Sequence, residues 1–118
     1  MDMYETITLC GCSAYEQKYF LNPKFLGLPE AIKEELKIMC VLYTEDVGGI
    51  LTLEFDEEGA LLFQVRAEEG DLLFDEIGSV LKVKQLQREK EDLLSSLALY
   101  YRAFILKEDL ASLLEEED

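Results

Sequence analysis

The feature that most restricts the fold of this chain is a pair of short apolar runs that flank an acidic segment. The runs, residues 50–55 and 61–65, are rich in branched and aromatic side chains. The four residues between them, three acids followed by Gly59, are typical of a hairpin connection. The sequence therefore predicts two adjacent antiparallel strands over about residues 50–66.

A helical pattern precedes this hairpin. Pro29 suits the first position of a helix, and Glu30 is favourable in the first turn because its charge complements the helix dipole. Apolar residues then recur at helical spacing: Ala31, Ile32, Leu36, Met39, Cys40 and Tyr43. The pattern stops before Gly48-Gly49, a pair that fits a helix cap. These signals predict an N-terminal helix over about residues 29–46.

A second helical pattern follows the hairpin, and Asp71 is placed to cap its start. Its apolar positions form two stripes: Leu73, Ile77, Val80 and Leu81, then Leu93, Leu97, Tyr100, Tyr101 and Phe104. We expect the three aromatic residues of the second stripe to belong to the core. Residues 82–92 between the stripes are mostly polar. The sequence therefore predicts one long or bent C-terminal helix over about residues 72–106.

Together these patterns predict an α+β fold with a small antiparallel sheet that contains the hairpin. The predicted helices lie on either side of the hairpin in the chain, and the C-terminal one covers a face of the sheet. Residues 4–21 combine strand-like alternation with turn signals, so we expect a short strand or hairpin there. We predict a single domain over residues 1–118, with a frayed tail at residues 108–118.

The charge of the chain restricts its partners. Among 118 residues, 26 are acidic and 11 are basic, which gives a formal net charge of -15 at pH 7. Nucleic acids and anionic membranes are bound mainly through Lys and Arg, so direct binding to either is disfavoured. A basic protein or a cation fits this charge better. A simpler alternative is that the acidity only keeps a small cytosolic domain soluble.

The residue types present exclude several chemistries. The chain has no histidine, which excludes Ser-His-Asp and Cys-His catalysis and every metal site that needs an imidazole. Cys10 and Cys12 lack the spacing of a zinc knuckle or of a redox pair, so we expect them and Cys40 to be small buried apolar residues. An odd number of cysteines without an export signal predicts a cytoplasmic protein. We expect no metal, no cofactor and no membrane span.

These observations favour a non-enzymatic protein–protein interaction module that self-associates. A long helix on a small sheet leaves its far end without a packing partner, and a homo-oligomer would supply one. An acidic edge of the hairpin would also steer a basic protein partner electrostatically. The predicted partner-binding residues are all acids: Glu54, Asp56, Glu57, Glu58, Glu68 and Glu69. No catalytic residue is predicted.

Two other functions fit the same acidic composition. A small carboxylate-based cation-binding protein or enzyme requires the acids of the hairpin turn to converge with a second group: Glu68, Glu69, Asp71, Asp75 and Glu76. An acidic mimic of nucleic acid requires rows of carboxylates at phosphate-like spacing. The sequence leaves both alternatives open.

Three short motifs resemble those of a family of small bacterial proteins of unknown function. The motifs are Leu-Pro-Glu at residues 28–30, Thr-Glu-Asp-Val-Gly-Gly at 44–49 and Leu-Phe-Asp-Glu-Ile-Gly at 73–78. The resemblance would cover most of the chain. It implies a cytosolic bacterial protein and carries over no active site, because the motifs have no mechanism of their own.

Overall fold

The computed structural model describes residues 6–106, so the predicted frayed tail at residues 108–118 lies outside the described residues. The described chain contains an antiparallel sheet in the strand order β2-β1-β3-β4. The strands are β1 (Ile7–Ser13), β2 (Lys18–Leu21), β3 (Ile50–Phe55) and β4 (Leu61–Arg66). The predicted central hairpin is therefore confirmed as β3–β4, and the N-terminal segment forms the β1–β2 hairpin.

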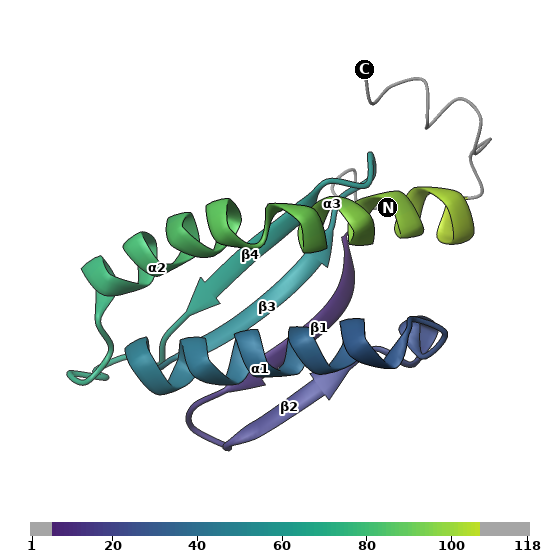
Figure 1. Ribbon diagram of the computed structural model, residues 1–118. Coiled ribbons are helices and arrows are strands. Elements are labelled where there is room, and N and C mark those ends of the chain that lie inside the picture. The colour runs from purple at the N-terminus through teal and green to yellow at the C-terminus, as the bar shows by residue number, and fades with distance from the viewer. Residues whose placement is uncertain (1–5, 107–118) are drawn as a thin grey trace.

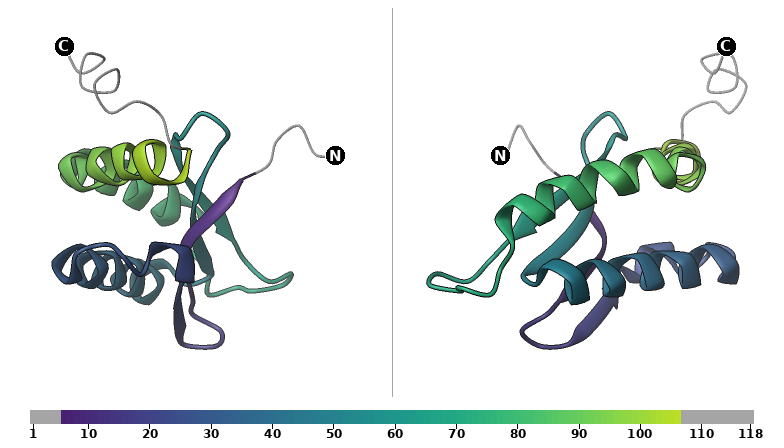
Figure 2. Two further views of the ribbon diagram at one scale, coloured as in Figure 1. Left: turned by 90° about the vertical axis from the view of Figure 1, so that its right-hand side faces the viewer. Right: turned by 60° about the vertical axis from the view of Figure 1, so that its left-hand side comes forward.

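The helices lie together on one face of this sheet, as both views of Figure 2 show. They are α1 (Glu30–Val47), α2 (Glu76–Glu89) and α3 (Glu91–Tyr100), and a π-helical turn, η2 (Tyr101–Ile105), continues α3. A short 3-10 turn, η1 (Pro23–Phe25), leads from β2 towards α1. In Figure 1, α1 crosses the sheet beside the path taken by α2 and α3. The arrangement confirms the predicted α+β fold.

The core lies between the helices and the sheet face that they cover. Pairing in register places Cys10 opposite Leu53 and Cys12 opposite Leu51, with all four side chains on this face. The largest fully buried side chains come from every layer: Tyr43, Phe25, Phe55, Leu9, Leu36, Leu51, Leu53 and Leu97. Burying each such side chain contributes roughly 1.5–3 kcal/mol before conformational entropy is counted. This shared core holds α1 and α3 against the sheet.

The ends of α1 follow the signals in the sequence. The helix begins one residue after Pro29, which is its N-cap rather than its first helical residue. It ends at Gly48, whose φ of 80° is unfavourable for residues with a Cβ. The Gly48 N–H group donates a hydrogen bond of 2.9 Å to the Thr44 carbonyl and closes the last turn. The predicted glycine cap is therefore confirmed.

The C-terminal helical region begins later than the predicted residue 72 and is divided. Asp75, not Asp71, is the N-cap, because its carboxylate accepts the Gly78 N–H group at 2.8 Å. Asp71 instead accepts the Leu73 N–H group within the preceding loop. Lys90 separates α2 from α3 with non-helical backbone angles. Of the two predicted alternatives, one long helix or a bent one, the structure has the bend, and it lies in the polar segment between the two apolar stripes.

The two apolar stripes have different environments. Of the aromatic residues expected in the core, Tyr101 is buried and Tyr100 is half-buried, whereas Phe104 is exposed. Tyr101 stacks on Phe55 of β3 with ring centroids 4.3 Å apart and an interplanar angle of 6°. The second stripe is therefore largely a packing stripe. The first stripe is exposed.

Candidate interaction surface

Two of the six acidic residues predicted to bind a partner stabilise the hairpin itself. The Glu54 carboxylate lies on the sheet face away from the helices and accepts hydrogen bonds from the hydroxyls of Thr6 (2.9 Å) and Thr52 (3.1 Å). Asp56 begins the β3–β4 turn, and its carboxylate accepts two backbone N–H groups of that turn, both at 2.9 Å. Both carboxylates therefore have partners within the described chain.

The other four predicted residues are exposed and lie in two separate places. Glu57 and Glu58 are in the β3–β4 turn, whereas Glu68 and Glu69 follow the far end of β4. A strand of this length spans about 20 Å, which separates the two pairs. The structure therefore places the six acids in two groups at opposite ends of the hairpin.

A group of exposed apolar side chains lies beside the second acidic group. We call it the α2 patch, and its members are Leu72, Leu73, Ile77, Val80 and Leu81. The exposed fractions are 96% for Leu72, 92% for Leu73 and 77% for Ile77. The first two residues lie in the β4–α2 loop, which projects at the left of Figure 1, and the others lie on the first turns of α2. Grouped exposed apolar residues of this size mark interaction sites in soluble proteins.

A groove of about 650 Å³ runs along the same region. Its apolar lining comes from β4, the loop and α2: Val65, Phe74, Ile77, Val80 and Leu81. Apolar surface thus continues from the exposed patch into the groove. A partner that covers the patch would also find a recess into which apolar side chains fit.

Hydrogen bonds hold the β4–α2 loop in place. The Tyr15 hydroxyl, from the β1–β2 turn, donates to the Asp71 carboxylate at 2.6 Å and accepts the Glu68 N–H group at 2.8 Å. This contact lowers the pKa of Asp71 and raises the pKa of Tyr15. At the other end of the loop, the Asp75 N–H group donates to the Val47 carbonyl at 3.1 Å. Leu72 and Leu73 are therefore presented by an anchored loop.

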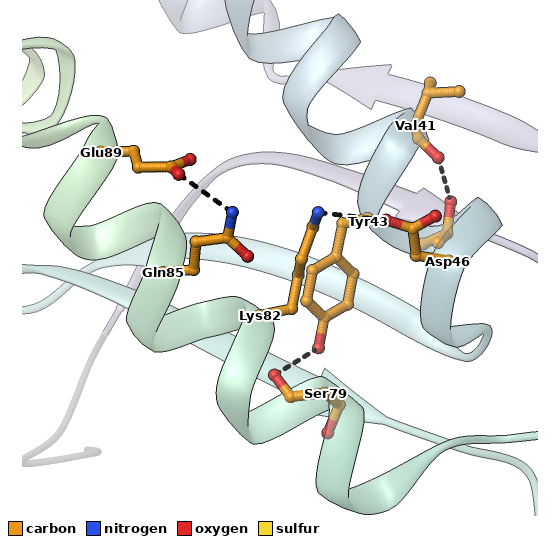
Figure 3. A network of polar contacts seen from close by, with 8 residues as sticks. Val41, Tyr43, Asp46, Ser79, Lys82, Gln85 and Glu89 are labelled. Atoms are coloured by element: carbon orange, nitrogen blue, oxygen red, sulfur yellow. Dashed lines mark hydrogen bonds and ion pairs between the residues drawn. The ribbon is translucent and has the colours of Figure 1, made fainter.

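Contacts between α1 and α2 determine which side of α2 faces solvent. The Lys82 ammonium lies 3.1 Å from the Asp46 carboxylate, and the buried Tyr43 hydroxyl donates to the Ser79 carbonyl at 3.4 Å (Figure 3). Burial raises the pKa of Tyr43, which favours the protonated hydroxyl that donates this hydrogen bond. Because α1 engages this side of α2, Ile77 and Leu81 are left on the outer side.

The three cysteines form a buried cluster apart from the patch. The Cys10 and Cys40 sulfurs are 3.8 Å apart, and the Cys12 sulfur is 3.4 Å from the Thr44 hydroxyl. Contact with the Cys10 thiol, together with burial, raises the pKa of the Cys40 thiol. Within residues 6–106, no group of three or more Cys, Asp or Glu side chains is arranged to hold a metal ion. The prediction that the cysteines are buried is confirmed.

We expect these thiols to react slowly in the native protein because all three are buried away from a reagent in solution. With an aromatic disulfide reagent, native Cys10, Cys12 and Cys40 should react at least about tenfold more slowly than in denaturant. The matched control is Ser96→Cys, which adds one thiol at an exposed position of α3. Equal reaction rates for the native cysteines and the added thiol would contradict the buried cluster.

A second cleft, of about 690 Å³, lies between the β1–β2 turn and α1. Cys12, Tyr19 and Thr44 contribute to its lining, and Lys18 and Lys37 are exposed at its rim. Burial raises the pKa of Tyr19. The cleft lies on the β2 side of α1, whereas the α2 patch lies on α2 and its preceding loop. The cleft and the α2 patch therefore lie in different places on the molecule.

Sequence reasoning identified Ile77, Val80, Leu81 and Leu73 as one stripe but did not recognise them as exposed. Leu72 begins the predicted C-terminal helix but belongs to neither of its apolar stripes. The position of the helix cap decides whether Leu72 and Leu73 lie in the helix or in the loop before it. Because the helix starts after Asp75, both leucines lie in the loop. The acids on either side of these leucines are consistent with that solvent-exposed loop.

None of the helices in the described part of the chain has the length and apolar character that crossing a membrane requires. Searches of curated proteins and of solved structures found no match to the chain. A family model, described as a family of unknown function, matches residues 6–109 and so covers most of the chain. The match agrees with the resemblance carried by the three sequence motifs. The chain therefore belongs to the DUF6145 family, a family of unknown function.

Proposed function

We propose that this chain is a cytoplasmic bacterial protein–protein interaction module that self-associates through the α2 patch and has no enzymatic activity. The observation that carries the proposal is the exposure of Leu72, Leu73 and Ile77 on an anchored loop and helix. Scattered exposed apolar residues are normal on protein surfaces, but a contiguous group is characteristic of an interface. The adjoining groove supports the same conclusion.

The apolar burial that the patch offers is similar in size to the cost of association. Covering a large apolar side chain contributes roughly 1.5–3 kcal/mol, and the patch has five of them. Lost translational and rotational freedom opposes association by about 4–15 kcal/mol, and the net charge of -15 on each copy adds long-range repulsion. We therefore expect a reversible oligomer whose population depends on protein concentration.

The acidic surface supports a second class of partner. Glu57 and Glu58 are exposed at the β3–β4 turn, at the opposite end of the sheet from the β4–α2 loop. Their charge would accelerate association with a basic protein, since rim charges act mainly on the rate of encounter. A basic partner at this turn would leave the α2 patch available for self-association.

Ile77→Glu is expected to shift the protein to the monomer at concentrations where the wild type is oligomeric. The substitution places a charge in the centre of the patch, where covering it would require desolvation. Sedimentation velocity over a concentration series measures the effect. The fold should be unchanged, because Ile77 is 77% exposed.

Leu26→Glu is the matched control, because Leu26 is 59% exposed but lies between η1 and α1, away from the patch. It should associate like the wild type. A wild type that is monomeric throughout the series would contradict the proposed self-association. Equal weakening by both variants would contradict the assignment of the interface to the α2 patch.

A further inference from the structure

The basic residues of α2 and of its C-cap, Lys90, divide into two groups on different sides of the helix. Lys82 and Lys90 form ion pairs with Asp46 and Glu35 of α1, both at 3.1 Å. Lys84 and Arg88 are exposed and have no ion pair within residues 6–106. They follow Ile77 and Leu81 at helical spacing on the same side of the helix: Ile77, Leu81, Lys84 and Arg88. The outer stripe of α2 therefore changes from apolar to basic along its length.

The other end of this surface is acidic. Glu68 and Glu69 lie in the β4–α2 loop, and Asp75 and Glu76 lie at the start of α2, all with exposed side chains. Leu72 and Leu73 lie among these acids. Along the direction of α2, the surface thus presents an acidic end, then the apolar residues Ile77, Val80 and Leu81, then bases. A surface with this order is complementary to a second copy of itself turned through 180°.

We infer that a second copy of this chain covers the α2 patch with its own α2 antiparallel, about a two-fold axis between Ile77 and Leu81. This inference rests on the proposed self-association and specifies its geometry. Ile77 of one copy then packs against Leu81 of the other. Lys84 and Arg88 of each copy lie beside the acidic β4–α2 loop of its partner. A parallel arrangement would instead bring acids against acids and bases against bases.

The dimensions of α2 fit this arrangement. The axis lies near residue 79, so at 1.5 Å per residue the start of the helix at Glu76 is about 5 Å away and Arg88 is about 13 Å away. Arg88 therefore extends past the start of the partner's helix and reaches the level of the partner's loop. Two copies of the same charge contact form, because the axis relates them.

The same observations distinguish a second copy from a basic partner at this patch. A uniformly basic partner would be attracted by the acidic loop but repelled by Lys84 and Arg88. A second copy presents both charges in the required order. It therefore satisfies both ends of the surface, and its own Ile77, Val80 and Leu81 cover the same apolar residues of the first copy between them.

The inference predicts that two variants, each impaired alone, restore association when mixed. Glu68→Lys with Glu69→Lys makes the loop basic, and Lys84→Glu with Arg88→Glu makes the helix acidic. Within each variant like charges meet, and we expect self-association at least about tenfold weaker than that of the wild type. In the mixed dimer, the basic helix of the loop variant lies beside the acidic loop of the helix variant. At the second contact, the acidic helix of the helix variant lies beside the basic loop of the loop variant. The heterodimer should approach wild-type affinity.

The measurement is sedimentation velocity of each variant and of their equimolar mixture, with one chain carrying a fluorescent label. A control pair carries the same changes in net charge at other places: Glu57→Lys with Glu58→Lys, and Lys24→Glu with Lys37→Glu. The control variants should retain association alone and gain nothing on mixing. This control separates local pairing from the overall charge of the chains.

The outcomes separate the geometry from the proposed function. Restoration in the loop and helix mixture alone supports the antiparallel pairing. If the wild type associates and Ile77→Glu abolishes this, but mixing restores nothing, the patch is an interface and the antiparallel geometry is wrong. A wild type that remains monomeric overturns both the proposed self-association and the geometry. Capture of a basic protein on the patch, with no dimer, also overturns the inference.

Discussion

Phe55→Ala is expected to lower the free energy of unfolding by about 3–5 kcal/mol, because it leaves a large cavity in the centre of the core. Phe55 is fully buried, stacks on Tyr101 at 4.3 Å and also faces Phe25 at 5.6 Å between ring centroids. These rings come from β3, η2 and η1. Removing the central ring therefore weakens the contact between the sheet and the end of the helical layer.

Urea unfolding at a fixed protein concentration measures this loss, since an oligomer makes stability depend on concentration. The matched control is Phe20→Ala, in which the same side chain is removed from an exposed position of β2. The control should lose about 1 kcal/mol or less. Similar losses in the two variants would show that the rings of Phe25, Phe55 and Tyr101 are not the centre of the core.

Gly49→Ala is expected to destabilise the protein by at least about 2 kcal/mol, because backbone strain and a steric clash act together. Gly49 has a φ of 74°, in the left-handed region. A Cβ at this position would lie 2.7 Å from the Arg66 carbonyl oxygen and 2.9 Å from the Phe74 ring. The carbonyl belongs to the paired β4 strand and cannot move without disturbing the sheet.

Gly70→Ala is the control that distinguishes the effect of backbone strain from the effect of the steric clash at Gly49. Gly70 has a similar φ of 81°, but a Cβ there would have no neighbour within 4 Å. It should lose only the strain, about 1–2 kcal/mol, partly offset by reduced freedom of the unfolded chain. Thermal unfolding of the two variants at one concentration makes the comparison. Equal losses would mean that the close approach of Gly49 to β4 and Phe74 has no energetic consequence.

The Gly49 contact also bears on the proposed interface. Phe74 packs over Gly49 and lies next to Leu73 in the β4–α2 loop. Displacing the Phe74 ring would therefore disturb one wall of the groove beside the α2 patch. Gly49→Ala should weaken self-association as well as stability, whereas Gly70→Ala should leave the groove intact.

The fold was predictable where local signals agree with one another. In α1, the helical spacing of apolar residues ends at a glycine pair, and Gly48 adopts the positive φ that such a cap requires. In β3, alternation places Leu51, Leu53 and Phe55 on one face, and all three are fully buried. The acidic turn before Gly59 joins this strand to β4. These elements depend on interactions between residues close in the chain.

The start of α2 was not predictable in the same way, because Asp71 and Asp75 are both suitable caps. Contacts from distant parts of the chain decide between them. The Tyr15 hydroxyl holds Asp71 in the loop, and the Val47 carbonyl holds the backbone of Asp75. Neither partner is close in sequence. As a consequence Leu72 and Leu73 remain outside the helix and are almost fully exposed.

The positions of the predicted partner-binding acids also depend on contacts that the sequence does not reveal. The acids of the hairpin were recognisable as a group by composition, but β4 carries Glu68 and Glu69 to the end of the sheet opposite Glu57 and Glu58. Hydrogen bonds from Thr6 and Thr52 engage Glu54, and their pattern follows from strand pairing. Position in the sheet, rather than charge alone, separates these acids into different environments.

The sequence by itself determined the α+β class, the β3–β4 hairpin, the bounds of α1 to within one residue and the acidic character of the surface. These properties follow from periodicity, turn residues and charge, which are local or additive. Only the tertiary structure decided that the stripe from Ile77 to Leu81 faces solvent. The physical reason is that a periodic apolar stripe has the same spacing whether a sheet or a second molecule covers it. Because α1 packs against the other side of α2, this stripe is left facing solvent.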